Sequence, residues 1–433
     1  MKTLILLDSG ATQISKKEKI LYFLLLFFFV ALYMPGIPWL YNVAMWLFFV
    51  YSFFFNSFKE KWRLLKERPE ILIMMLFLVL NAVSSILSIN QKEGISFLGI
   101  RISLFVIPLA IGPIYIKGYL KDRIVLGFAA VTTIAALGCL IWGIYRAGKN
   151  NDWSLLYNDN LSDIINFQSI YFAMLINLAI FGFTYLIAKK SPLINAGILV
   201  PVFFVLLIIH FLLASRMAIL ILYSAVFIYA VVHIVLKKKW LEGVTLIMGI
   251  FIAGFLLVKF FPKTINRFKE LTYTKFDYNS TAKESHFNVA LQADQWNGAN
   301  LRIAVWQCAW TVIKEHMVFG TGLGDKMDVL KKEYGKKGFV FGIQTNRNTH
   351  NNYIDIWLSL GIVGLIIFLT GFIIWPFFKC YSTGDWLGAI IILSFTVSLL
   401  SETYMDRTMG NTLLAFFAAF ISSYKKPKEN INY

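Results

Sequence analysis

Apolar residues recur along the chain in long stretches, and short polar segments separate them. Twelve stretches can be marked out, and a helix needs about 20 apolar residues to cross the hydrocarbon layer of a membrane. Backbone groups cannot stay unpaired in lipid, so each stretch is predicted to be a helix. The predicted spans are residues 20–35, 37–57, 71–89, 95–116, 124–145, 166–188, 192–213, 217–236, 240–261, 351–378, 386–401 and 408–424.

The composition supports a helical membrane protein. Hydrophobic residues make up 58% of the chain and charged residues 15%, whereas soluble domains are about half apolar and about a quarter charged. These figures exclude a water-soluble globule, a disordered chain and a small disulfide scaffold. Cys139, Cys308 and Cys380 are too scattered for a set of zinc ligands, so no metal or cofactor is predicted.

The distribution of basic residues predicts the orientation of the chain. The net charge of +17 would suggest nucleic-acid binding in a soluble protein. Here 21 Lys and Arg fall in alternate loops, including both termini, and only 5 fall in the short loops between them. Basic loops stay in the cytoplasm. Both termini are therefore predicted to be cytoplasmic, and residues 262–350 to lie on the outer face.

The long loop divides the chain into three parts. We predict a nine-span region over residues 1–261, a loop module over 262–350 and a three-span region over 351–433. Within the loop, a helix is predicted from Asn300, its cap, to Met317, before the glycine-rich turn at 320–324. The apolar side chains expected on one face of that helix are Ile303, Trp306, Trp310 and Ile313.

Two arginines at the outer face are candidates for binding an anion. Arg216 lies in Ala214-Ser215-Arg216, at an outer turn between two predicted spans. Its simplest alternative role is to hold a helix end at the lipid headgroups. Arg302 lies on the predicted loop helix, and its alternative is an ordinary exposed arginine.

His350 is a candidate for proton transfer. It lies in Asn348-Thr349-His350-Asn351-Asn352, where the loop re-enters the membrane. Histidine changes its charge near neutral pH, which suits a general base. The alternative is a polar cluster that caps the next helix, with Asn348 or Thr349 as the cap.

Further charges lie at the same face. Glu402, Asp406 and Arg407 share a short outer loop, as a mutual ion-pair cluster or as the floor of a polar site. The spans are almost free of charge at mid-depth, since Arg101 and Asp355 lie nearer their outer ends. A transporter usually carries ionisable residues at the midplane. The pattern therefore indicates chemistry or binding at the outer membrane surface, on an anionic substrate.

These residues resemble the bacterial O-antigen ligase family, within a wider ligase and polymerase superfamily. His350-Asn351, nine residues and then Gly361-Ile-Val-Gly364 match the family's His-Asn-x9-Gly-x-x-Gly signature. Arg302, the turn at 320–324 and His350 resemble its large periplasmic loop. Ala214-Ser215-Arg216 resembles its other arginine position.

The resemblance implies a membrane-embedded glycosyltransferase of the bacterial inner membrane. Such an enzyme moves a glycan from undecaprenyl diphosphate to a sugar hydroxyl of the lipid A–core, at the periplasmic face. The reaction inverts the anomeric carbon and uses neither a nucleotide sugar nor a metal. Arg216 and Arg302 would hold the diphosphate, and His350 would act as the base or as a diphosphate ligand. Asn351, Glu402 and Arg407 are possible supporting residues.

Three rival functions remain open on the sequence. Some O-antigen polymerases are described with Arg-x10-Gly motifs, but here the matching positions are Phe227 and Ile313. That difference favours a ligase over the first rival, a polymerase that joins lipid-linked repeat units. The second rival is an oligosaccharyltransferase that acts on protein. The third belongs to a different class and is a flippase or exporter of lipid-linked glycan.

Overall fold

The structure is a computed structural model that describes residues 14–37, 39–260, 265, 268–282, 284–285 and 295–424. Lys2, Lys425, Lys426 and Lys428, which contribute to the predicted orientation, lie outside these ranges. The described residues form helices, with one isolated bridge between Ile116 and Tyr424. The chain is therefore an all-α, multi-pass membrane protein, as predicted.

The helices of the described residues fall into four groups along the chain. The first group is α1 (Lys16–Leu32), α2 (Leu40–Phe55), α3 (Phe58–Lys66), α4 (Pro69–Leu87), α5 (Gln91–Arg101), α6 (Ser103–Ile111) and α7 (Gly118–Asn150). The second group is η1 (Trp153–Leu156), α8 (Asp159–Ser162), η2 (Asp163–Ile165), α9 (Ser169–Ala188), α10 (Ala196–Leu212), α11 (Arg216–Val235) and α12 (Trp240–Phe260). The loop then forms η3 (Glu270–Thr272), α14 (Asn300–Glu315), α15 (Lys326–Lys336) and α16 (Val340–Gln344). The last group is α17 (Asn352–Leu369), the π-helical η4 (Thr370–Ile374), α18 (Trp375–Thr383), α19 (Trp386–Ser398), η5 (Tyr404–Asp406) and α20 (Thr408–Ser423).

Each of the twelve predicted stretches coincides with one or more helices. By length and composition, seven helical segments in the described residues can cross a membrane, or eight if the bent pair α2 and α3 forms one span. The apolar helices α10, α19 and α20 are shorter than 18 residues. The number of twelve spans therefore stays a prediction.

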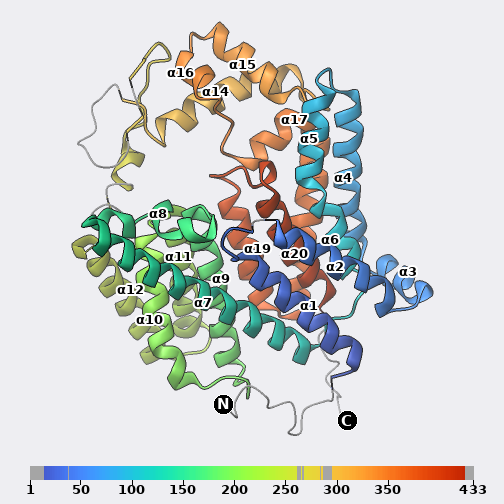
Figure 1. Cartoon of the computed structure of the whole chain (residues 1–433), viewed down its shortest axis with the longest axis vertical. Coiled ribbons are helices and arrows are strands. Elements are labelled where there is room, and N and C mark those ends of the chain that lie inside the picture. The colour runs from blue at the N-terminus through green and yellow to red at the C-terminus, as the bar shows by residue number, and fades with distance from the viewer. Residues whose placement is uncertain are drawn as a thin grey trace.

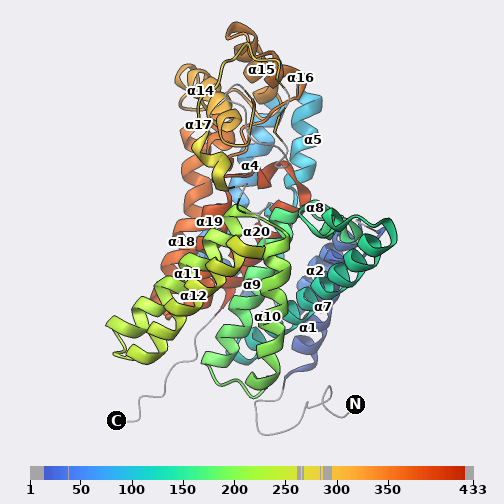
Figure 2. The same cartoon turned by 90° about the vertical axis from the view of Figure 1, so that its left-hand side faces the viewer.

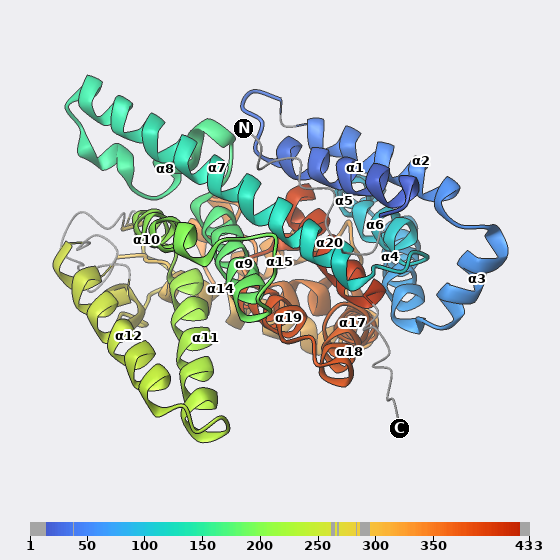
Figure 3. The same ribbon diagram turned by 90° about the horizontal axis from the view of Figure 1, so that it is seen from below.

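The helices surround a core that runs through the middle of the molecule. Viewed from below, α9, α19 and α20 occupy the centre, with α1 and α2 on one side and the α11–α12 hairpin on the other (Figure 3). Most of α9 is buried: 83% of an 18-residue apolar stretch of this helix lies inside the protein. In α12, only 11% of the corresponding stretch is buried. The exposed apolar side chains of α12 are suited to contact with lipid.

The loop helices α14, α15 and α16 gather at one end of the molecule, which we call the loop end (Figures 1 and 2). They share a small core around Trp296, Leu330, Tyr334 and Phe339. The tip of the α4–α5 hairpin also reaches the loop end, where the Asp325 carboxylate accepts hydrogen bonds from two backbone N–H groups of that tip. The loop is therefore attached to the membrane helices by specific contacts.

Two details of the predicted loop helix were wrong. Asn300 is the first residue of α14 and does not cap it with its side chain. The buried face also differs from the expected one: Trp310 is exposed, and Ile303 and Trp306 are half-buried. The face that packs inward consists of Leu301, Ala304, Val305, Cys308, Ala309, Val312 and Ile313. Small residues on this face allow close packing, and large aromatic residues are left for the outer face.

Candidate active site

A cavity of about 650 Å³ lies at the loop end, between the membrane helices and the loop helices. Four residues selected from the sequence line it: Arg216, Arg302, His350 and Glu402. They come from α11, α14, the segment before α17 and the segment after α19. Positions nearly 190 residues apart in the sequence therefore meet in one cavity.

The two arginines approach each other at Gly298. A Cβ atom at this glycine would lie 3.1 Å from Arg216 Nη2 and 3.3 Å from Arg302 Nη1. Glycine therefore leaves room for both guanidinium groups at the same wall of the cavity. Arg216 is also the first residue of α11, where the helix dipole is positive. This wall combines several positive charges and is suited to an anion.

Arg302 is held by three acceptors and is not an ordinary exposed arginine. Its Nη1 donates to the Gly298 carbonyl at 2.7 Å. Its Nη2 donates to the Ser401 carbonyl at 3.1 Å and to Glu402 Oε1 at 3.2 Å. The side chain is 22% exposed. Arg302 thus joins α14 to the segment after α19 at the wall of the cavity.

His350 lies next to the same carboxylate. The distance from His350 Nδ1 to Glu402 Oε2 is 3.5 Å, within ion-pair range but long for a hydrogen bond. Catalytic hydrogen bonds are often this long before substrate binds. His350 Nδ1 is buried, and about a third of the side chain is exposed. The ring therefore lies at the cavity with Nδ1 directed at Glu402.

Glu402 carries the negative charge of the site. Burial raises its pKa, but His350, Arg302 and Arg407 together hold the pKa below the ordinary value for a glutamate. The carboxylate is therefore ionised at neutral pH. It contacts both Arg302 and His350, so it can orient the histidine and offset one positive charge.

The two remaining supporting candidates do not line the cavity. Asn351 is the N-cap of α17, and its Oδ1 accepts from the N–H groups of Tyr353 and Ile354. The expectation that Asn348 or Thr349 caps this helix was wrong. Arg407 is exposed, and its guanidinium lies 5.9 Å from the centre of the Tyr171 ring. It affects the site only at longer range, through the charge of Glu402.

The predicted mutual cluster of Glu402, Asp406 and Arg407 is not formed in the described part of the chain. Glu402 pairs with Arg302 and His350, whereas Asp406 pairs with Lys326 and Arg101. The sequence did not indicate this second set of charges, because Lys326 lies in a polar loop among other lysines. Isolated charges beside spans, such as Arg101 and Asp355, signal that buried partners exist without identifying them.

The glycine signature contains a break in the helix that follows His350. Gly361 has φ +69° and interrupts α17. The turn after α14 fills the interruption. Thr321 and Gly322 donate their N–H groups to the carbonyls of Leu358 and Ser359. Below the break, the Ile362 and Val363 N–H groups find carbonyl partners at Met317 and Val318. The glycine-rich turn therefore stops α14 and also docks it onto α17.

Further residues of the cavity were not found from the sequence. Trp306 lines it and donates its indole N–H to the Thr349 carbonyl at 2.7 Å, next to His350. Glu284 and Arg347 also line it and form an ion pair with each other. Trp306 was expected only as a packing residue of the loop helix, and nothing in the spacing of Glu284 and Arg347 distinguishes them from the rest of a polar loop.

Residues 201–369 match the O-antigen ligase family. This range contains Arg216, Arg302, His350, and the glycines of the interrupted helix. None of the curated proteins matches the chain. The family implies a multi-pass membrane enzyme of the ligase or polymerase type, acting on lipid-linked glycans. The resemblance expected from the sequence is confirmed over residues 201–369, which are similar to the O-antigen ligase family.

Proposed function

We propose that this protein transfers a glycan from undecaprenyl diphosphate to a sugar hydroxyl of the lipid A–core, at the periplasmic face of the bacterial inner membrane. The observation that carries the proposal is the convergence of two guanidinium groups and a histidine–glutamate pair in one cavity. These are the groups that a displacement with a diphosphate leaving group requires.

The two arginines are suited to bind the diphosphate of the donor. A guanidinium presents parallel N–H groups that match two phosphate oxygens, and Arg216 and Arg302 both reach the wall at Gly298. When the bond between the anomeric carbon and the diphosphate breaks, negative charge develops on the leaving oxygen. Fixed positive charges in a cavity stabilise it as it forms. We assign this role to both arginines, without a metal.

His350 is suited to accept the proton of the acceptor hydroxyl. The acceptor oxygen attacks the anomeric carbon from the face opposite the diphosphate, and the configuration inverts. The hydroxyl proton passes to His350 Nε2 as the new carbon–oxygen bond forms. Glu402, near Nδ1, stabilises the imidazolium that results. If His350 instead binds the diphosphate, its replacement weakens donor binding, and the experiment that closes the Discussion separates the two roles.

The membrane setting is part of the proposal. We infer that the loop end faces the periplasm and that both termini are cytoplasmic, because basic residues collect in alternate loops. The cavity includes the first residues of α11 and the segment before α17. A lipid diphosphate at the outer headgroup layer has its charge at the end of the spans, which is where the arginines lie.

Lipopolysaccharide from a deletion strain tests the function. Loss of a ligase leaves bare core while lipid-linked polymer accumulates. Loss of a polymerase, the alternative that the family match also allows, leaves core with a single repeat. Loss of a flippase leaves bare core and single repeats on the cytoplasmic side. We expect the first pattern, restored by the wild-type gene, and either of the latter two patterns contradicts the proposal.

A further inference from the structure

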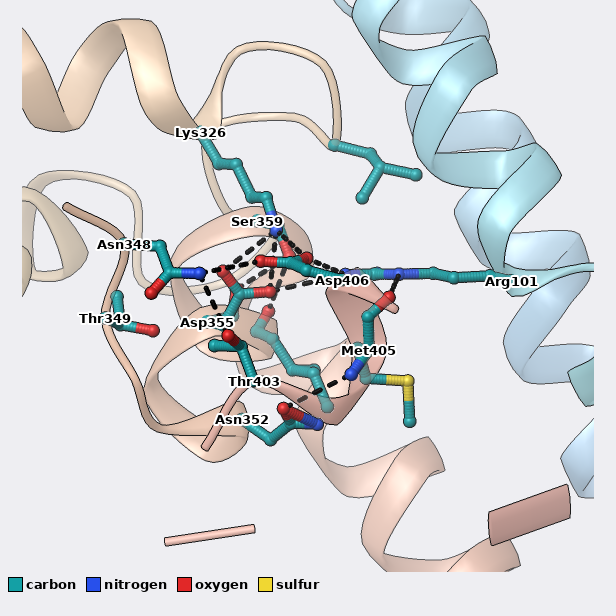
Figure 4. A network of polar contacts seen from close by, with 12 residues as sticks. Arg101, Lys326, Asn348, Thr349, Asn352, Asp355, Ser359, Thr403, Met405 and Asp406 are labelled. Carbon is teal, nitrogen blue, oxygen red and sulfur yellow. Dashed lines mark hydrogen bonds and ion pairs between the residues drawn. The ribbon is translucent and has the colours of Figure 1, made fainter. Parts of the chain in front are cut away.

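Four charged side chains form a buried cluster beside the cavity (Figure 4). Lys326 Nζ lies 2.9 and 2.8 Å from the two carboxylate oxygens of Asp355 and 2.7 Å from Asp406 Oδ1. Arg101 Nη2 lies 3.3 Å from Asp355 and 3.5 Å from Asp406. Lys326 and Arg101 are fully buried, and Asp355 is 1% exposed. The two positive and two negative charges balance.

The cluster joins four elements that are distant in sequence. Arg101 ends α5, Lys326 begins α15, Asp355 lies in the first turn of α17, and Asp406 ends η5. Arg101 also donates to Asn81 of α4 at 2.7 Å and to the Met405 carbonyl at 3.3 Å. The position of the segment that carries Glu402 is therefore fixed from both the loop and the membrane helices.

Asn348 connects this cluster to His350. Its Nδ2 donates to Thr403 Oγ1 at 2.9 Å and, more weakly, to Asp406 Oδ2 at 3.4 Å. Its Oδ1 accepts from the backbone N–H of His350 at 3.2 Å. Thr403 directly follows Glu402. One amide side chain therefore holds the backbone of His350 next to the segment that carries its carboxylate partner.

The backbone of His350 requires such support. Its φ of +42° lies in the left-handed region, which residues other than glycine rarely adopt. A conformation of this kind persists only where surrounding contacts hold it. Without the hydrogen bond that the His350 N–H donates to Asn348, the His350 backbone can relax and move the ring away from Glu402.

We propose that Asn348, Lys326 and Asp406 are positioning residues: the buried charge cluster holds Asp406, Asp406 and Thr403 hold Asn348, and Asn348 holds His350 beside Glu402. This inference rests on the proposed function, since it assigns His350 a role in transfer. It explains the cluster better than stability does. Burying four charges carries a large desolvation cost, and apolar replacements are often equally stable.

The test measures glycan transfer by purified variants in which a residue between the buried cluster and His350 is replaced. Lipid-linked glycan and acceptor are supplied as substrates. Asn348→Ala removes both the donor and the acceptor, and Lys326→Gln removes the charge that holds Asp406. We expect each to lower kcat by about 10- to 100-fold, as a catalytic group displaced by about 1 Å does. The donor KM should change little, because the arginines are untouched. The double variant should be no slower than the slower single variant, since both act through one connection.

Lys121→Gln is the matched control. Lys121 and Asp385 form an equally buried ion pair, 3% and 2% exposed, between α7 and the N-cap of α19. This control should lower the melting temperature without changing kcat per folded molecule. The proposal is overturned if Lys326→Gln and Lys121→Gln change the melting temperature and kcat equally and Asn348→Ala keeps the wild-type kcat. If Lys326→Gln does not fold, the kcat of Asn348→Ala alone decides whether the proposal stands.

A second measurement does not depend on transfer. Diethyl pyrocarbonate modifies accessible histidine rings, and mass spectrometry reports the rate at His350. We expect Asn348→Ala and Glu402→Gln both to change this rate in the same direction, because both separate the ring from the carboxylate. An unchanged rate in Asn348→Ala contradicts the positioning role. If wild-type protein transfers no glycan while the rate changes as expected, the proposed function fails and the positioning of His350 stands.

Discussion

Glu402 connects the positively charged and titratable side chains of the cavity. It is the carboxylate that contacts both Arg302 and His350, and the guanidinium of Arg216 lies close by, against Gly298. Two guanidinium groups and this carboxylate therefore meet at one wall of the cavity.

The geometry of the arginines leads to the first prediction. Arg216→Lys and Arg302→Lys keep the charge but lose the planar fork that binds two oxygens. We expect transfer to fall at least about 100-fold in each, comparable to the loss of a donor that stabilises a transition state. The measurement is glycan transfer by purified variants at equal protein levels. Arg63→Lys is the control, since Arg63 is 62% exposed on α3, and it should be fully active. Wild-type transfer by both cavity variants contradicts the assignment.

The lowered pKa of Glu402 leads to the second prediction. A carboxylate whose pKa is lower in the folded protein stabilises the fold above its ordinary pKa, about 4.5. That contribution disappears as the pH falls through the lowered value. Glu402→Gln should therefore be less stable than wild type at pH 6, and the difference should shrink below about pH 4.5. Thermal unfolding of both proteins across pH 3 to 7 measures this. If the difference in stability between the two proteins vanishes above pH 5.5, the pKa of Glu402 is not lowered in the folded protein and the prediction is wrong.

Single residues could be identified from the sequence where they were unusual for their position. Arg216 and His350 are ionisable residues at the ends of predicted spans, so they could be selected. Lys326 and Asn348 could not, because a lysine or an asparagine in a polar loop is ordinary. Their importance comes from burial and from partners up to 80 residues away in the sequence, which no local pattern contains.

At the scale of elements, the interrupted helix α17 carries both the site and the cluster. His350 precedes its cap at Asn351, Asp355 lies in its first turn, and the break follows at Gly361. The turn after α14 fills the break with backbone hydrogen bonds. Arg302 lies on α14, so the same junction fixes the distance between the arginine and the histidine.

The third prediction concerns Gly361. A Cβ atom there would lie 2.1 Å from the Val318 carbonyl oxygen, and its φ is +69°. Gly361→Ala is expected to destabilise the fold by more than the strain alone, which is about 1–3 kcal/mol. Gly335→Ala on α15, where a Cβ meets nothing within 4 Å, should be neutral. Thermal unfolding in detergent compares them. Equal melting temperatures contradict the proposed junction.

Element types were predictable, and their internal details were not. Long apolar runs in lipid can only be helices, so α1, α2, α4 to α7, α9 to α12 and α17 to α20 were expected, whereas α3 and α8 lie in predicted loops. The inward face of α14 was missed because aromatic side chains were taken to be buried, whereas Trp310 is exposed and Ala304 and Cys308 are buried. The break at Gly361 was not predicted, because an isolated glycine inside a helical pattern is tolerated.

At the scale of the whole molecule, the described structure has two distinct ends. The loop helices and the cavity lie at the loop end, and α1 begins at the opposite end (Figures 1 and 2). The basic pattern of the loops predicted this separation. It did not predict that the α4–α5 hairpin would support the loop module through Asp325, because that contact depends on tertiary packing.

The fourth prediction concerns orientation. Lys332 is exposed on α15 and Lys237 is exposed between α11 and α12. Lys332→Cys should react with a membrane-impermeant thiol reagent in intact spheroplasts, whereas Lys237→Cys should react only after the membrane is broken. The native cysteines, which are buried, should contribute little background. The reverse pattern contradicts the periplasmic position of the cavity.

The most direct test of the proposed chemistry is the transfer rate of His350→Ala. The purified variant should fold and should bind lipid-linked glycan, because Arg216 and Arg302 are intact. Its transfer to the acceptor should fall by about 100- to 10,000-fold, the usual effect of losing a general base. Donor binding with lost turnover supports His350 as the base, and loss of binding makes it a diphosphate ligand. Transfer within a few-fold of wild type contradicts the central claim, since the histidine would then have no part in the reaction.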